Sequence, residues 1–197
     1  MTLKIAYFPP VEYFALLAKY SSVYIEACED CQKQSYRNRC LIYAENGIQA
    51  LNFPVIHENG TFSLPIKDIK VDYSTPWVRK TVKCIDSAYM SSAFYEYYRD
   101  EMVSILESEP ETLWELDMSI IRFFMRKIGL ATNLHETPEF DKNCEEIHPK
   151  RPNNILKDLG VDKSYYQVFA QRHGFIPNLS VMDLLFNEGP ASIDYLR

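Results

Sequence analysis

The chain opens with Leu3-Lys4-Ile5-Ala6-Tyr7-Phe8, a short apolar stretch that predicts a β-strand ended by Pro9-Pro10. Residues 11–20 carry apolar side chains at helical spacing, and residues 23–27 form a second strand-like stretch. A strand, a helix and a strand in this order are typical of a right-handed crossover, which joins parallel strands. The opening therefore predicts a parallel pair of strands as the start of the fold.

Further strands are expected in the first third of the chain. Residues 39–43 and 48–56 are apolar stretches on either side of Asn46-Gly47, and Asn-Gly is the strongest short signal for a β-hairpin. Residues 66–73 alternate polar and apolar side chains, as a half-exposed edge strand does. This part of the sequence predicts a hairpin followed by one more strand.

The remaining two thirds of the chain are predicted to be mainly helical. Helical patterns follow Thr75-Pro76, and a late helix is predicted from a capping motif that begins at Ser180. The expected helices are 77–90, 93–109, 113–128 and 181–186. We expect one domain over residues 1–197, strand-rich in 1–74 and helix-rich in 75–197, with a long polar loop at about 131–162. The fold class is mixed α/β or α+β.

Composition excludes several classes of function. The 197-residue chain has a net charge of -6, so a general nucleic-acid-binding role is not expected. No stretch approaches the roughly 20 apolar residues of a membrane span, and the first residues lack a signal-peptide core. We expect a soluble, cytoplasmic protein whose five cysteines are free thiols.

Metal and cofactor motifs are not expected either. Cys28 and Cys31 form a CxxC pair, but their spacing to Cys40 and His57 fits no standard zinc pattern. The sequence contains no phosphate-binding P-loop and no dinucleotide fingerprint. We therefore expect no metal and no cofactor.

A basic island at residues 33–39 is the first candidate binding site. In an extended strand, Lys33, Arg37 and Arg39 would share one face and could clamp a phosphate or carboxylate. Asn38 would lie on the opposite face with the neighbouring amides. The alternative is solvated charge that pairs with nearby acids such as Glu29.

The second candidate group lies in and after the first long helix. Trp77, Arg79 and Lys80 stand at a helix start, where backbone amides favour an anion, and Tyr89 could stack on a sugar. The alternative is a solvated helix face with Trp77 and Tyr89 packed in the core.

The last candidates lie near the C-terminus. Of these, His173 can move a proton near neutral pH, although a lone histidine is more often structural. Asn178 is a polar residue among apolar ones, and we include it among the substrate-binding candidates.

Four segments in order along the chain resemble the WbqC-like protein family: Ile5–Pro10, Lys33–Arg39, Trp77–Lys80 and His173–Pro190. The resemblance covers nearly the whole chain. Two departures stand out. Longer members carry a histidine in the first turn, where this chain has Tyr7-Phe8, and a Gly-rich strand unit where this chain has only the polar stretch 131–162.

The resemblance implies a bacterial protein of surface polysaccharide biosynthesis, since family members occur in O-antigen gene clusters. The implied function is a transferase-type enzyme that acts on a nucleotide-sugar or an acyl/aminoacyl-type substrate. An alternative is a non-catalytic binding or scaffold protein that uses the same basic edge. Either function implies an anionic small-molecule ligand, and the oligomeric state is left open.

Overall fold

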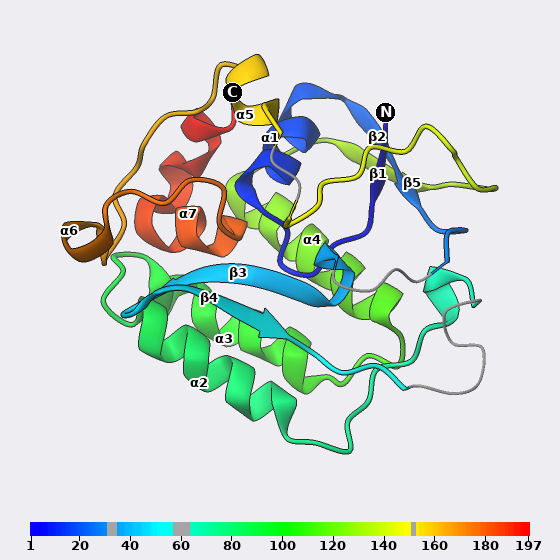
Figure 1. Cartoon of the computed structure of the whole chain (residues 1–197), viewed down its shortest axis with the longest axis horizontal. Helices are drawn as coiled ribbons and strands as arrows, with labels where there is room; N and C mark the ends of the chain where they lie inside the picture. Colours follow the sequence, from blue (N-terminus) through cyan, green and yellow to red (C-terminus); the bar gives the residue numbers. More distant parts are fainter. Residues whose placement is uncertain (31–34, 57–63, 151–152) are drawn as a thin grey trace.

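The predicted crossover is present in the computed structural model, which describes residues 1–30, 35–56, 64–150 and 153–197. Strands β1 (Thr2–Lys4) and β2 (Ser22–Glu26) are parallel neighbours, and α1 (Val11–Lys19) connects them (Figure 1). Leu3, Val23 and Ile25 are fully buried, so this pair contributes directly to the core. The mixed α/β fold expected from the sequence is confirmed.

A third parallel strand lies where the sequence predicted a loop. Strand β5 (Asn133–Glu136) pairs with β2, which gives a sheet of order β1-β2-β5. Only Leu134 of its four residues is apolar, and most of the strand is exposed, so no alternating pattern marks it. Its position depends on backbone pairing with β2 at the edge of the sheet, a long-range contact that a local pattern does not report.

The Asn-Gly hairpin is confirmed. Strands β3 (Arg39–Ala44) and β4 (Gly47–Asn52) are antiparallel, and Gly47 takes a φ of +101° in the turn. The strand predicted at residues 66–73 is wrong, because this stretch begins with the 3-10 helix η3 (Ile66–Asp68). The apolar side chains of this stretch are buried one by one, as Ile66, Ile69 and Val71 are. Its backbone makes isolated bridges, Lys70 to Thr112 and Val71 to Val55, in place of a continuous strand.

The helical part matches the expectation closely. Helix α4 shows both predicted end signals: Thr112 and Glu115 form a capping box, and Gly129 ends the helix in the left-handed conformation. The remaining helices include two short ones, α5 and α6, in the stretch predicted as a loop and just after it. The helices are α2 (Trp77–Tyr89), α3 (Tyr95–Glu107), α4 (Leu113–Ile128), α5 (Ile155–Asp158), α6 (Ala170–His173) and α7 (Val181–Glu188), with 3-10 turns η1 (Tyr36–Asn38) and η4 (Gly189–Tyr195).

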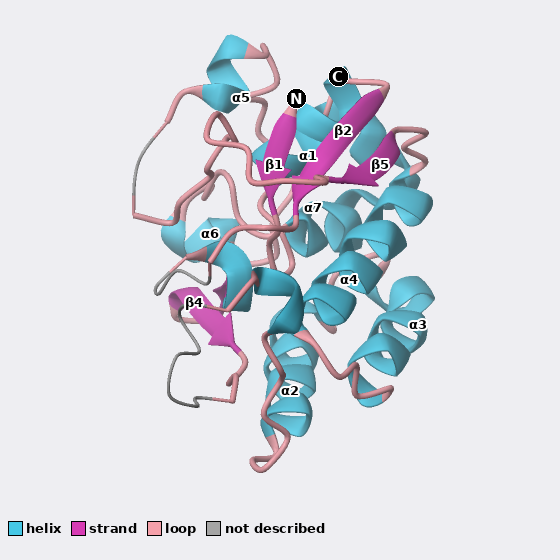
Figure 2. Cartoon of the chain, turned by 90° about the vertical axis from the view of Figure 1, so that its right-hand side faces the viewer, coloured by secondary structure: helices cyan, strands magenta, loops and turns pink. Residues whose placement is uncertain are grey.

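Helix α4 is the centre of the packing. It contacts α3, α7, η1 and η4, while α2 packs against α3 and β3. Figure 2 shows the parallel sheet at the top of the view, α4 and α3 below it, and α2 toward the opposite end. The buried apolar side chains of all these elements form one continuous core. Among the residues that the structure describes, no helix is long and apolar enough to cross a bilayer.

Candidate functional site

Three segments that are distant in sequence are hydrogen-bonded to one another after the end of β1. The Tyr7 amide donates to the Tyr36 carbonyl at 2.8 Å, which joins the β1–α1 turn to η1. The Val181 amide donates to the Pro9 carbonyl at 2.8 Å, which joins the same turn to the start of α7. Carboxyl ends of parallel strands are where open α/β sheets bind ligands. The first, second and fourth segments of the family resemblance therefore meet in the expected region.

The β1–α1 turn is locally strained. Phe8 has a φ of +40°, which is rare for a bulky residue, and its ring is fully buried. Its ring packs edge-on against Tyr7 and Phe124, with ring centroids 4.7 and 5.9 Å apart. Strained backbone of this kind persists only where packing holds it in place, and it concentrates at functional sites. In this chain the strained turn at Phe8 directs the backbone into α1, which begins at Val11.

A pocket of about 290 Å³ opens beside the first turn of α1. It is lined by residues of α1, of η1, of the polar stretch before α5 and of the segment before α7. We call it the Glu12 pocket, and its lining residues are Glu12, Tyr36, His148, Pro149, Lys150, Asn153 and Asn178. Its size is near the lower end of the range for small-molecule sites.

Glu12 is the most unusual group in this pocket. It is the second residue of α1, and only 3% of its surface is exposed. Burial raises the pKa of the Glu12 carboxyl, and the nearby Glu145 acts in the same direction. Hydrogen bonds from the Asn178 and Asn153 side chains act against this rise in pKa. A carboxyl with a raised pKa, facing a pocket, is suited to accept and return a proton.

Asn178 holds Glu12 in two ways. Its Oδ1 accepts a hydrogen bond from the Glu12 backbone amide at 3.0 Å, so it caps α1 from another part of the chain. Its side chain also hydrogen-bonds the Glu12 carboxyl. Asn178 itself has a φ of +56°, a conformation that asparagine tolerates better than most residues.

We expect Asn178→Ala to lower the free energy of unfolding by about 1–2 kcal/mol, because it removes a helix cap and places alanine in the left-handed region. Asn178→Gly removes the same cap but accepts the backbone conformation, so its loss should be smaller. Urea denaturation of both variants measures the difference. Equal losses would contradict the assigned role of the backbone conformation.

The lining of the Glu12 pocket also includes a histidine and a lysine, His148 and Lys150. Residues 148–150 form a turn in which the Lys150 amide donates to His148 Nδ1 at 3.1 Å. The pocket thus combines a buried acid with basic groups, an arrangement that can bind an anion and move a proton.

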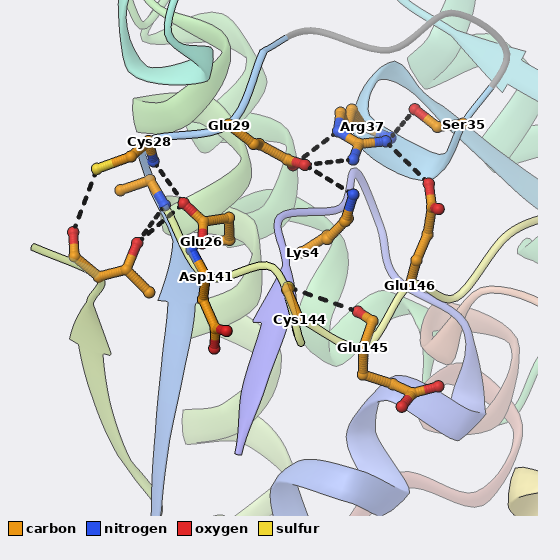
Figure 3. A network of polar contacts seen from close by, with 12 residues as sticks. Lys4, Glu26, Cys28, Glu29, Ser35, Arg37, Asp141, Cys144, Glu145 and Glu146 are labelled. Atoms are coloured by element: carbon orange, nitrogen blue, oxygen red, sulfur yellow. Dashed lines mark hydrogen bonds and ion pairs between the residues drawn. The ribbon is translucent and has the colours of Figure 1, made fainter. Parts of the chain in front are cut away.

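A network of buried charges lies next to this pocket (Figure 3). Arg37, the neighbour of Tyr36, makes a two-pronged bond to Glu29, with Nε–Oε1 at 2.8 Å and Nη2–Oε2 at 2.7 Å. Lys4 Nζ lies 3.0 Å from Glu29 Oε2, and Arg37 Nη1 lies 3.6 Å from Glu146. These contacts join the end of β1, the segment after β2, η1 and the stretch before α5.

Glu26, the last residue of β2, anchors the neighbouring part of Figure 3. Its carboxylate accepts hydrogen bonds from the Cys28 and Asp141 amides and from the Thr137 hydroxyl, at 2.7 to 3.0 Å. Glu26 is fully buried, and these three donors compensate for its loss of water. This carboxylate holds the loops at the end of the sheet together through two backbone amides and one hydroxyl, so we assign it a structural role.

The basic island is placed differently from the expected extended clamp. Lys33 lies outside the described residues. Arg37 is 2% exposed and bonded to Glu29. Asn38 donates from Nδ2 to the Phe53 carbonyl at 3.0 Å, and Arg39 begins β3 in a half-buried position.

The second candidate group does not line the Glu12 pocket. Trp77 is buried and stacks on Tyr73, with ring centroids 5.7 Å apart. Tyr89 is buried, and its hydroxyl accepts from the Tyr43 amide at 3.3 Å. Lys80 is exposed, whereas Arg79 lines another pocket, of about 330 Å³, which shares no lining residue with the Glu12 pocket.

His173 and Asn178, the two candidates near the C-terminus, lie in different surroundings. His173 ends α6 on the surface, where its Nε2 donates to the Glu45 carbonyl in the β3–β4 turn at 2.9 Å. Asn178 lines the Glu12 pocket. Of the sequence-proposed residues that the structure describes, Asn178 is therefore the one that lines the Glu12 pocket.

Sequence reasoning overlooked Glu12, His148 and Lys150. Glu12 had one usable signal, because it is the single acid in the apolar run that follows Pro9-Pro10. An acid in such a run is either at the edge of the buried face or functional. His148 and Lys150 lie in a stretch without periodicity, and only the fold brings them to α1.

The fold and its pocket can be compared with known proteins. A family model described as "WbqC-like protein family" matches residues 6–167. An uncharacterised protein of Mycobacterium tuberculosis, Rv1507c, is 23% identical over 219 residues, covering 97% of this chain and 94% of the relative. No solved structure matches the chain significantly. The matched region includes Glu12, Tyr36, His148 and Lys150, whereas Asn178 follows it.

Proposed function

The chain belongs to the WbqC-like protein family, and from this premise we propose that it is a transferase-type enzyme of bacterial surface polysaccharide biosynthesis. Its substrate is a nucleotide-linked sugar or an acyl/aminoacyl-type compound, and the reaction takes place in the Glu12 pocket. The observation that carries the proposal is the buried Glu12 carboxyl, whose pKa is raised, in a pocket that also presents His148 and Lys150. The role in polysaccharide synthesis rests on the family resemblance.

In this proposal the lining residues of the pocket have different tasks. Lys150 and His148 hold the phosphate or carboxylate of the substrate. Glu12 acts as the general base: an acceptor hydroxyl or amine gives its proton to the carboxylate as its oxygen or nitrogen bonds to the electrophilic carbon of the donor. The leaving group, a nucleoside diphosphate or a thiol, departs with the electron pair of the broken bond. Burial helps because it makes the Glu12 carboxylate more basic.

The test combines a ligand screen with a product assay. Sugar nucleotides should raise the melting temperature of the wild type in a concentration-dependent way. In a mass-spectrometric assay with a sugar nucleotide and an acyl thioester, Glu12→Gln should lower product formation by about 10²-fold or more, because it removes the base. Binding should change much less, since glutamine has the same shape.

Glu96→Gln is the matched control. Glu96 is the second residue of α3, as Glu12 is of α1, but it is exposed and lies outside the pocket lining. This variant should keep full product formation. If ligands bind but Glu12→Gln and the wild type behave alike, the non-catalytic binding alternative replaces the enzyme. If no sugar nucleotide changes the melting temperature, the nucleotide-sugar version fails.

A further inference from the structure

We propose that the Glu12 pocket recognises an amine, so that its substrate class is an amino sugar phosphate and not the corresponding neutral sugar phosphate. The inference rests on the proposed function, because it specifies the ligand of the same pocket. It rests on two observations among the described residues: the hydrogen-bond partners of the Glu12 carboxyl, and the charged side chains near the pocket.

The first step concerns the partners of Glu12. Its carboxyl is hydrogen-bonded by the amides of Asn153 and Asn178, which are neutral groups. Within the described part of the chain, no lysine or arginine forms an ion pair with Glu12. By contrast, Glu29, which is equally buried, contacts both Lys4 and Arg37. A buried carboxylate without a counter-charge is costly, and a cationic ligand would remove that cost.

The second step concerns the field at this wall. Glu145 raises the pKa of the Glu12 carboxyl, so a second negative charge acts on this carboxyl. An ammonium group is attracted to both acids and donates up to three hydrogen bonds, whereas a hydroxyl leaves the negative charge uncompensated. The Glu12 wall is therefore complementary to an amine.

The third step concerns the rest of the ligand. Lys150 and His148, which line the same pocket, are suited to a phosphate. A pocket of about 290 Å³ has room for a compact ligand with an amine at one end and an anion at the other. A sugar ring bearing an amine and a phosphate has both groups in a small volume. In the proposed reaction the bound ammonium gives a proton to the Glu12 carboxylate only at the chemical step, as its nitrogen bonds to the donor carbon.

Isothermal titration with two commercial probes tests this inference. Glucosamine 1-phosphate and glucose 1-phosphate differ in one group, an amine in place of a hydroxyl. The wild type should bind the amine about 10-fold more tightly, the size expected for one charge-assisted hydrogen bond. Glu12→Gln should bind both probes with equal affinity, and the control Glu96→Gln should keep the wild-type preference.

Each other outcome overturns the inference in a distinct way. Equal affinities in the wild type, or an amine preference that survives in Glu12→Gln, would show that Glu12 does not select an amine. If neither probe binds but a sugar nucleotide does, the amine inference fails and the proposed function stands. If neither the probes nor any sugar nucleotide bind, the amine inference and the nucleotide-sugar version of the proposed function fail together. Circular dichroism of Glu12→Gln confirms that the variant is folded before the titration is interpreted.

Discussion

Glu29→Ala is expected to lower the free energy of unfolding by about 3–5 kcal/mol, because it leaves buried cations without their counter-charge. The Glu29 carboxylate contacts Arg37 through two hydrogen bonds and Lys4 through an ion pair. Without it, Arg37, which is 2% exposed, keeps only the longer contact to Glu146 as an ion pair within the described part of the chain. Urea denaturation at neutral pH measures the loss.

Arg37→Ala should cost less than Glu29→Ala. In this variant Glu29 still has Lys4 at 3.0 Å, so its charge remains paired. Replacing both Glu29 and Arg37 by methionine should cost less than Glu29→Ala alone, because the fully buried guanidinium is then removed together with its partner. A double-mutant cycle of Glu29→Met, Arg37→Met and the double variant separates the interaction energy of the pair from the loss of packing.

The exposed ion pair between Lys70 and Glu111 is the control for this prediction. Its side chains are 58% and 70% exposed and solvent screens their attraction, so Glu111→Ala should leave stability nearly unchanged. A Glu29→Ala effect of the same small size would contradict the buried network. So would an Arg37→Ala effect larger than that of Glu29→Ala.

Local sequence signals predicted the elements that begin or end at a capping residue or a turn residue. Thr112 and Gly129 enclose α4, and Asn46-Gly47 makes the hairpin turn, because these residues satisfy backbone requirements within a few positions. Strand β5 was missed since its single buried-side residue, Leu134, depends on a partner 111 residues earlier, Val23, for its pairing. Long-range pairing of short edge strands leaves almost no local pattern.

The binding site was predictable only in part, for a related reason. The strand argument at residues 33–39 assumed an extended backbone, but residues 36–38 form a 3-10 turn that directs Arg37 into the protein toward Glu29. The positive charges of this stretch suggested an anion-binding clamp, but Arg37 is buried and its guanidinium is bonded to Glu29 as part of the structure. In contrast, Glu12 looked like an ordinary helix residue, and apart from Tyr36 the other residues of its pocket are more than 130 positions away in the sequence. Burial and cross-chain contacts, which a single sequence does not display, distinguish these two residues.

Asp183→Ala is expected to lower the free energy of unfolding by about 3 kcal/mol at neutral pH, because it leaves buried donors without an acceptor. The Asp183 carboxyl is 1% exposed and accepts from the Tyr165 hydroxyl at 2.7 Å and from Gln167 Nε2 at 2.8 Å. Gln167 also holds the segment before α7 through two bonds to the Ile176 backbone. The loss should therefore extend to the segment that positions Asn178.

Asp183→Asn isolates the effect of charge at the same site. Burial raises the pKa of Asp183 from 3.8 to about 6. Between these values the folded state keeps a proton that the unfolded state has lost, so raising the pH destabilises the wild type relative to Asp183→Asn. The difference should grow by up to about 3 kcal/mol from roughly pH 4 to pH 6 and stay constant above. Urea titrations of both proteins at several pH values give this difference directly, and a difference that does not vary with pH would show that Asp183 has an ordinary pKa.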